Sequence, residues 1–533
     1  MRIQSYITGK NHWLLEPDLP SILSQYWPEH INYQDELISF GELVGNRAYA
    51  LADYIDHDAP PTLVMHDING VRIDRARLCP AHENLLIDLA PMNCPPYRGS
   101  SWLHHFTLGF LLADPGLYCS LIVTNQTAYA IHKYAPEFKN WIDDLLSGKM
   151  WGATWMTETQ GGSDLGANTT IARRENGGWK LYGEDKYFAS NAGLADLAIV
   201  TARPEGAPAG PKGLALFLVP RETSEGELNF KIRRIKNKSA TRAVPTGEVE
   251  LFGSLAYLVG KEELGIYYTL ENLTVSRLAN AIGACGLARK AHLEALFRTR
   301  FRTAFGKFLH LHPLVRYDLT DLSVRTAGSL ALTFHAIQAF DAVWQEHPPY
   351  NLEYHYARFL SHLVKNRTAD HAAESTRLAI ELFGGLGFME ECAVYRLHRE
   401  ALVTAIWEGT SNMQALDLLE AVQKKSAHEP FLDEFDHILS NANTPMARQA
   451  KETIQNIFSQ RTKLSQDQSQ WYAKDTLNRL ADAAQVALLY KLSNNGEERY
   501  AKLAELYALR FLLGQPYPHW ALDDQTIWYP VSE

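Results

Sequence analysis

Residues 169–182, TTIARRENGGWKLY, decide which part of this chain forms a sheet. Runs of β-branched and aromatic residues flank the turn sequence Glu175-Asn176-Gly177-Gly178, a pattern that indicates a β-hairpin. Strand signals are confined to about 151–260, where short runs alternate with Gly, Asn and Pro. Three further runs extend the expected sheet: 198–201, 214–219 and 248–252.

Apolar residues with helical spacing lie on both sides of this segment. Single helices are expected at 36–54, 103–113, 128–146, 267–301, 314–344 and 354–382, with a further helical group at 431–514 after a short link at 424–430. The order of these elements predicts an α+β protein with four parts. These are an N-terminal helical domain (1–150), a middle antiparallel β domain (151–262), a C-terminal helical bundle (263–425) and an extra C-terminal helical block (426–533).

Composition excludes several classes of protein. The 533 residues are 46% hydrophobic and 21% charged, which is enough apolar material for substantial cores and excludes general disorder. A net charge of −10 gives no overall electrostatic case for nucleic acid. The most apolar stretch, 102–123, is interrupted by polar residues and Pro115, so no membrane span is expected.

The five cysteines are scattered and contain no CxxC pair. Neither a disulfide framework nor a metal site is therefore expected, and the pattern is typical of a reducing cytoplasm. The N-terminal residues lack the apolar core of a signal peptide, which favours the same location.

Two glycine-rich clusters interrupt the scaffold. Residues 156–164, MTETQGGSD, come just before the expected hairpin and suit either a flexible loop or a site where backbone amides approach a planar ligand. Residues 383–388, FGGLGF, follow an expected helix. A helix cap needs one glycine, whereas this cluster has three. Close approach of the backbone to a phosphate would explain the additional glycines.

The third cluster is 406–414, IWEGTSNMQ. In one interpretation, Ser411 and Gln414 form a capping box for the helix that follows. In the other, Glu408 lies partly desolvated after the apolar run 401–407, and a carboxylate with raised proton affinity suits general-base chemistry.

Taken in order, five motifs resemble the acyl-CoA dehydrogenase family, and most of all its alkylation-response, AidB-type subgroup, over essentially the whole chain. The motifs are MTETQGGSD (156–164), GEDKYFASN (183–191), RTAFGK (302–307), ELFGGLGF (381–388) and WEGTSN (407–412). The resemblance implies FAD held between the sheet and the second helical domain. It also implies an oxidoreductase acting on CH–CH groups of acyl-CoA thioesters.

The resemblance also assigns roles to individual residues. Glu408 matches the catalytic base, and Arg277 matches an arginine on the CoA side of the substrate. Arg302 and Phe305 match residues that reach the FAD of a neighbouring subunit, so a homo-oligomer, as a tetramer, is implied. The remaining residues expected to bind FAD are Met156, Thr157, Ser163, Phe188, Ala189, Ser190, Glu381, Gly384, Gly385, Trp407, Gly409, Thr410 and Asn412.

Some positions depart from the mainstream family pattern. Phe188 stands where Trp is usual, and Glu381, Pro313 and Asn412 stand where Gln is usual. These are choices of the AidB-type subgroup, which is known for poor acyl-CoA activity. Ser276 excludes the alternative position of the base that some members use.

Two partners follow from the resemblance: an electron-transfer flavoprotein as electron acceptor, and DNA. The DNA contact proposed for the subgroup is a basic C-terminal block, but residues 424–533 hold 12 Lys and Arg against 14 Asp and Glu. A balanced block offers no stripe of phosphate contacts, so the sequence disfavours DNA binding without excluding it.

Overall fold

The computed structural model describes residues 4–461, 463–494 and 496–529. The chain forms two compact units. One unit comprises the described residues of 1–50, 101–113 and 277–533, and the other comprises 51–100 and 114–276. The second of these carries the main sheet, and the first carries most of the helices.

The main sheet has seven strands, all within the predicted β segment. The hairpin predicted from 169–182 is confirmed, because β4 and β5 pair antiparallel around Glu175 and Gly178. The strands are β3 (Gly152–Trp155), β4 (Ile171–Glu175), β5 (Gly178–Ala189), β6 (Leu197–Pro204), β7 (Ala215–Pro220), β8 (Lys231–Ile235) and β9 (Gly247–Leu258).

Strand pairing closes part of this sheet on itself. The order β3-β6-β4-β5-β9-β7 is completed by a β6–β7 pairing, and β8 adds to β9. Most pairs are antiparallel, as predicted, but β6 runs parallel to both β3 and β4. The rings of Trp155 and Phe230 pack edge to face with their centroids 4.8 Å apart, and those of Trp179 and Phe217 do so at 5.3 Å. These aromatic rings fill the interior of the sheet.

A second hairpin lies outside the predicted β segment. The expectation that strands are confined to 151–260 is therefore wrong, since β1 (Thr62–His66) pairs antiparallel with β2 (Arg72–Arg77). Asp67 closes the turn, because its Oδ1 accepts from the backbone N–H groups of Asn69 and Val71 at 2.8 Å. The sequence signal was present in Asp67-Ile68-Asn69-Gly70, where Gly70 takes a positive φ of 79°.

The single helix predicted at 128–146 is also wrong. α6 (Pro115–Tyr134) begins at Pro115 and is capped by Asp114, whose side chain accepts from the N–H of Leu117 at 3.2 Å. It ends before Pro136, which has no N–H to donate, and α7 (Asn140–Leu146) follows. One more helix of this unit was not predicted: α4 (Pro80–Leu89).

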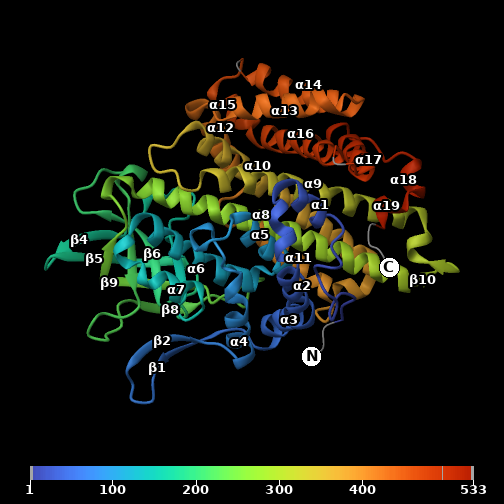
Figure 1. The fold of residues 1–533 in the computed structure, drawn as a ribbon. Helices are drawn as coiled ribbons and strands as arrows, with labels where there is room; N and C mark the ends of the chain where they lie inside the picture. Colours follow the sequence, from blue (N-terminus) through green and yellow to red (C-terminus); the bar gives the residue numbers. More distant parts are fainter. Residues whose placement is uncertain (1–3, 462, 495, 530–533) are drawn as a thin grey trace. The chain divides into compact units, whose positions relative to one another are not determined.

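The other expected helices are present with small shifts in their ends. They are α2 (Gln34–Leu43) and α3 (Tyr49–Asp58), which lie where one helix was predicted at 36–54, and α5 (Trp102–Leu112), α8 (Gly265–Phe301), α9 (Pro313–Val343), α10 (Leu352–Phe383) and α12 (Ser411–Lys425). Neither α1 (Leu19–Tyr26) nor α11 (Ala393–Thr404) was predicted. α9 and α10 run along each other, and α11 and α12 both pack on α10 (Figure 1). No helix among the described residues is long and apolar enough to cross a membrane.

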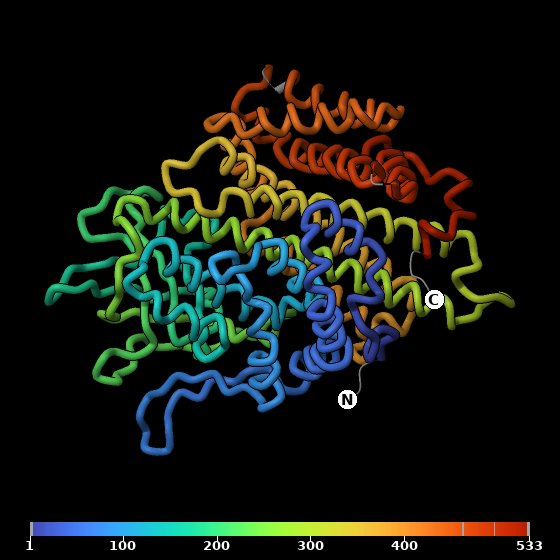
Figure 2. Tube along the Cα trace, viewed as in Figure 1, coloured from blue at the N-terminus to red at the C-terminus, as the bar shows by residue number. Residues whose placement is uncertain are grey.

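The helical group predicted at 431–514 is confirmed, although its first helix begins inside the predicted link and short helices follow position 514. Its helices are α13 (His428–Ala442), α14 (Pro445–Arg461), α15 (Gln466–Trp471), α16 (Ala473–Ser493), α17 (Glu498–Tyr507), α18 (Trp520–Asp523) and α19 (Gln525–Trp528). α16 packs on α9, α10 and α12, and every residue from Leu480 to Tyr490 is buried. The orange and red part of the trace in Figure 2 therefore shares a core with the helices before it.

Candidate active site

The predicted catalytic motif forms a tight turn between α11 and α12. Glu408 has a φ of 60° and Gly409 a φ of 96°, so both adopt a left-handed backbone conformation. Glycine adopts that conformation readily, whereas a side chain in it adds strain. The chain around Glu408 must therefore hold this turn in place.

Three side chains hold the turn through its backbone carbonyls. The carbonyl oxygen of Glu408 accepts from Arg277 Nε at 3.2 Å and from Gln414 Nε2 at 2.9 Å. The carbonyl oxygen of Gly409 accepts from Gln414 Nε2 at 3.0 Å and from Lys365 Nζ at 2.6 Å. Hydrogen bonds from charged donors are the strongest of these, so the turn is fixed by two cations and an amide.

The capping-box interpretation of this motif is wrong. Thr410 is the N-cap residue of α12, Ser411 is already inside the helix, and no side chain among the described residues caps that end. Gln414 is buried and directs its amide back to the turn, which is why the Ser-x-x-Gln spacing has another use here.

A second set of buried groups orients these donors. His362 Nδ1 lies 2.9 Å from Gln414 Oε1, and Arg277 Nη2 donates to Asp417 at 3.0 Å. Burial lowers the pKa of His362 to about 3, so its ring is neutral, with Nδ1–H as the donor to Gln414. On the other side of the motif, the indole N–H of Trp407 donates to the side-chain oxygen of Asn280.

The charges around Glu408 are mostly positive. Burial lowers the pKa of Lys365 to about 8, and the charge of Glu408 acts against that shift. Burial also lowers the pKa of Arg277, where Asp417 and Glu408 act in the opposite direction. Glu408 itself is half-buried, and a carboxylate with two cations near it is a group that can exchange a proton with a bound molecule.

Arg277 has a clear structural role in this turn. It is buried, and its Nε and Nη2 are engaged by Glu408 and Asp417. Its Nη1 is buried without a hydrogen-bond partner among the described residues. The contact of Arg277 with the CoA side of a substrate stays a prediction, and Nη1 is the donor that could make it.

The glycine-rich turn after α10 is open, as a backbone that approaches a phosphate must be. Gly384 has a φ of 66°, and a Cβ added at Gly384 or Gly385 would meet no atom within 4 Å. Phe388 follows with 74% of its surface exposed. Glu381 is exposed at the end of α10, where it pairs with Arg377, while Thr410 and Asn412 are exposed at the start of α12.

The predicted inter-subunit residues lie on a small exposed hairpin. β10 (Thr303–Ala304) and β11 (Lys307–Phe308) pair around Phe305, which is 97% exposed with a φ of 49°. Arg302 is exposed beside it. An apolar ring held out by a strained backbone is suited to contact another molecule.

The loop 156–164 is organised by a buried ion pair that the sequence interpretation missed. Glu158 Oε1 lies 2.9 Å from Lys186 Nζ, and both side chains are almost fully buried. Glu158 also accepts from the backbone N–H and hydroxyl groups of Thr169 and Thr170. Burial raises the pKa of Glu158, but Lys186 and these donors lower it to about 2.

This pair connects the loop to the strand that carries Phe188. The N–H of Tyr187 donates to the carbonyl of Thr157 at 2.9 Å. The ring of Phe188 is 54% exposed, whereas Ala189 is fully buried. The Ser190 hydroxyl accepts from the backbone N–H of Thr154 at 3.2 Å and donates to the backbone carbonyl of Thr154 at 3.1 Å.

The residues present fit a flavin ring. A Cβ added at Gly162 would lie 2.6 Å from Thr157 Oγ1, so only glycine leaves that hydroxyl accessible. Ser163 is exposed in the same loop, and Met156 is half-buried at its start. The hydroxyls of Thr157 and Ser163 can hydrogen-bond to a flavin ring, and the exposed ring of Phe188 can stack on one.

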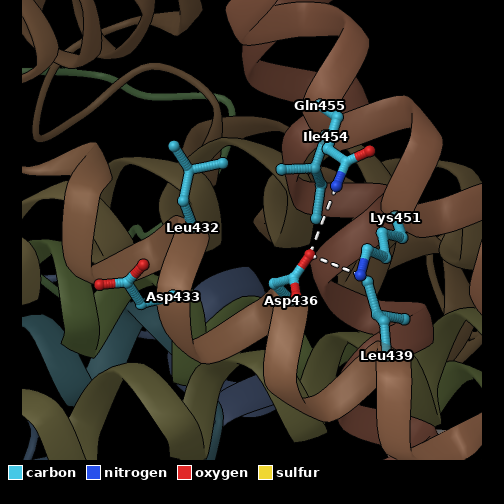
Figure 3. A pocket seen from close by; sticks show the side chains of 7 residues that line it. All are labelled: Leu432, Asp433, Asp436, Leu439, Lys451, Ile454 and Gln455. Atoms are coloured by element: carbon cyan, nitrogen blue, oxygen red, sulfur yellow. Dashed lines mark hydrogen bonds and ion pairs between the residues drawn. The ribbon is translucent and has the colours of Figure 1, made fainter.

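One pocket of about 200 Å³ lies away from all of these residues, between α13 and α14. Asp436 Oδ1 lies 2.7 Å from Lys451 Nζ and accepts from Gln455 Nε2 at 3.3 Å. Dashed lines in Figure 3 mark both contacts. The pocket is lined by Leu432, Asp433, Asp436, Leu439, Lys451, Ile454 and Gln455. It contains none of the predicted site residues.

Similarity to known proteins agrees with this geometry. Residues 153–253 match the acyl-CoA dehydrogenase middle domain, and residues 263–423 match the acyl-CoA dehydrogenase C-terminal domain. AidB of Escherichia coli is 28% identical over 75% of this chain and 76% of its own. An acyl-CoA dehydrogenase of Bacillus subtilis is 31% identical over 52% of this chain and 69% of its own.

The fold agrees as well. The solved structure of Caenorhabditis elegans ACDH-11 in complex with C11-CoA superimposes with a TM-score of 0.84, at 23% identity. It covers 99% of this chain and 96% of the other. The chain belongs to the acyl-CoA dehydrogenase family, whose members are FAD-binding oxidoreductases that act on CH–CH groups.

Proposed function

We propose that this protein is an FAD-dependent acyl-CoA dehydrogenase in which Glu408 removes the α-proton of an acyl-CoA thioester. The observation that carries the proposal is the left-handed turn at Glu408 and Gly409, fixed through its carbonyls by Arg277, Lys365 and Gln414. Backbone strain that several side chains hold in place is typical of functional sites, since a plain connection between two helices does not need it.

The residues of the turn perform the acid–base part of the reaction. The Glu408 carboxylate takes the α-proton, and its position is set by the backbone that Arg277 and Gln414 hold. The cations Arg277 and Lys365 place positive charge near the carboxylate, and Glu408 in turn acts to raise the pKa of both. Removal of the proton alone leaves a protonated Glu408 and negative charge on the α-carbon and the thioester oxygen; the α,β-unsaturated thioester would form only as the β-hydride leaves to a bound FAD.

FAD, when bound, supplies the redox chemistry by accepting the β-hydride of the substrate. Thr157, Ser163 and Phe188 would hold the ring, with Met156, Ala189 and Ser190 as their supports. The backbone of Gly384 and Gly385 would approach the pyrophosphate. The other residues assigned to FAD are Arg302, Phe305, Glu381, Trp407, Gly409, Thr410 and Asn412.

The same proposal includes partners and location. The exposed hairpin at Arg302 and Phe305 supports a homotetramer in which it reaches a neighbouring subunit. We propose an electron-transfer flavoprotein as acceptor and the cytoplasm as location. Light scattering on the purified protein tests the assembly, and Phe305→Asp is expected to reduce both assembly and FAD retention.

A second candidate function is supported by the similarity to AidB. In this case the protein is an AidB-type flavoprotein with little acyl-CoA activity, acting in the response to alkylation stress and contacting DNA. The C-terminal block gives no electrostatic support, because residues 424–533 carry a net charge of −2. Retention on duplex DNA that falls steeply with salt would favour this candidate.

The deciding experiment is an anaerobic titration of the FAD-loaded protein with acyl-CoA thioesters of different chain length. Bleaching of the oxidised flavin band by one chain class, lost in Glu408→Gln, is the expected result. Bleaching that survives in Glu408→Gln would exclude Glu408 as the base. No bleaching by any thioester, in a protein that dithionite reduces, would favour the AidB-type candidate.

A further inference from the structure

Lys236 lies against the aromatic ring that is expected to face the flavin. It follows β8 directly, and its Nζ lies 3.3 Å from the centroid of the Tyr187 ring and 4.6 Å from that of Phe188. The two rings are perpendicular, with centroids 5.2 Å apart. One ammonium group therefore contacts both members of an edge-to-face aromatic pair.

The ammonium group is itself held in place. Lys236 Nζ lies 2.7 Å from Glu248 Oε1, and both side chains are about 90% buried at this contact. The backbone N–H of Lys236 donates to the carbonyl of Thr246 at 2.7 Å. Hydrogen bonds from Arg234 and Lys236 lower the pKa of Glu248, so the carboxylate stays charged and fixes the cation.

We propose that Lys236 is a positioning residue for the flavin. Its ammonium group, fixed by Glu248, holds the ring of Phe188 in place. The inference rests on the proposed contact between Phe188 and the flavin ring. Phe188 is more than half exposed, so few side chains of its own unit restrict its rotation. A cation–π contact with a buried, paired ammonium supplies that restriction and places a positive charge near the flavin.

The chain provides a matched control at the other end of β8. Lys231 Nζ lies 4.4 Å from the centroid of the Phe252 ring, which is also exposed, at 48%. This pair has the same chemistry as Lys236 and Phe188, but Phe252 lies in none of the motifs assigned to FAD. Lys231→Met therefore reports the structural effect of removing such a contact without an effect on the flavin.

The test measures FAD affinity and flavin potential, neither of which needs turnover. Apoprotein is titrated with FAD for the wild type, Lys236→Met, Lys236→Arg and Lys231→Met. We expect Lys236→Met to weaken FAD binding about threefold to tenfold, as loss of one cation–π contact implies, and the other two variants to stay near the wild type. FAD affinity in Lys236→Met equal to that of Lys231→Met would overturn the inference.

The flavin potential separates electrostatics from a change in folding. Lys236→Met removes a positive charge and is expected to make the potential more negative, whereas Glu248→Gln removes a negative charge and should make it more positive. A purely structural role would move both in one direction, and unchanged potentials would contradict the proposal. If Lys236→Met does not fold, Glu248→Gln decides alone, and a more positive flavin potential in this variant is then the expected result. A wild-type protein that binds no FAD would instead refute the proposed function.

Discussion

The buried guanidinium of Arg277 donates from Nε to the backbone carbonyl of Glu408, 3.2 Å away, and from Nη2 to Asp417, 3.0 Å away. Arg277 thus connects α8 with the turn and with α12 at the same time. Arg277 therefore helps to set where Glu408 lies, in addition to placing a positive charge near it.

Arg277→Met should lower turnover at least tenfold while leaving FAD content unchanged. The carbonyl of Glu408 loses its charged donor, and Asp417 loses its partner, at a cost of about 2–4 kcal/mol in unfolding free energy. Steady-state kinetics and urea unfolding measure the two effects. Adding Asp417→Asn should restore part of the stability without restoring turnover. Turnover that follows stability in the double variant would argue against a positioning role.

Gly409→Ala tests the strain of the turn itself. The added Cβ would lie 2.8 Å from Gln414 Nε2, and Gly409 already has a φ of 96°. We expect a loss of about 1–3 kcal/mol in stability and a marked fall in turnover, because the amide of Gln414 must move away from the carbonyls. Gly496→Ala is a control with positive φ and open space around its Cβ. Equal effects of the two variants on turnover would contradict this account.

The support of this turn shows what sequence motifs leave out. WEGTSN identifies Glu408 and its neighbours, because those residues are adjacent in the chain. Lys365 on α10 and Arg277 on α8 bind the turn itself, and His362 on α10 binds Gln414, so all these contacts depend on how helices pack. Gln414 lies inside the quoted cluster, but its spacing from Ser411 also fits a helix cap, and only the structure separates the two uses.

Lys186→Met should destabilise the β domain and release FAD. Glu158 would then be a buried carboxylate without its cation, at a cost of about 3–5 kcal/mol. Combining it with Glu158→Gln should recover part of that loss, because no unpaired charge remains. Unfolding curves and flavin occupancy after gel filtration give the measurement. A single variant as stable as the wild type would show that Thr169 and Thr170 suffice to hold Glu158.

The same reasoning explains how well the fold itself could be predicted. The hairpin at 169–182 and the long helices α8, α9 and α10 carry many residues of one periodicity, and they are confirmed within a few residues. β1 and β2 lie among helical segments, so the turn signal at Asp67-Ile68-Asn69-Gly70 was not recognised as a hairpin. The helix at 128–146 was misplaced because its start depends on Pro115 and its end on Pro136.

Glu294 should make stability depend on pH. It is fully buried on α8, accepts from Ser5 and Tyr49 hydroxyls and the N–H of Tyr6, and burial raises its pKa to about 7. A carboxyl with a raised folded pKa is most favourable below its unfolded value near 4.5, and its contribution is lost as pH rises to about 7. The difference in unfolding free energy between wild type and Glu294→Gln should therefore fall by about 3 kcal/mol over this range. A difference that is constant with pH would contradict the raised pKa.

Removing the C-terminal block at Lys425 should prevent folding of the helical unit. α16 is buried against α9, α10 and α12, and Asp482 accepts two hydrogen bonds from Arg367, at 2.7 and 2.9 Å. α9 approaches so closely that a Cβ at Gly328 would lie 2.7 Å from both Gln485 and Tyr507. Truncation would expose this apolar surface, so we expect insoluble protein.

Gly328→Val in the full-length chain tests the same contact without removing residues. It should cost about 1–3 kcal/mol of stability by overpacking. Gly177→Val is the opposite case, because Gly177 has a φ of 80° and open space around its Cβ, so its substitution adds backbone strain without overpacking. Thermal unfolding followed by circular dichroism measures both. A soluble truncated protein with an intact flavin spectrum and altered assembly would show instead that the block is a separate domain that serves the oligomer.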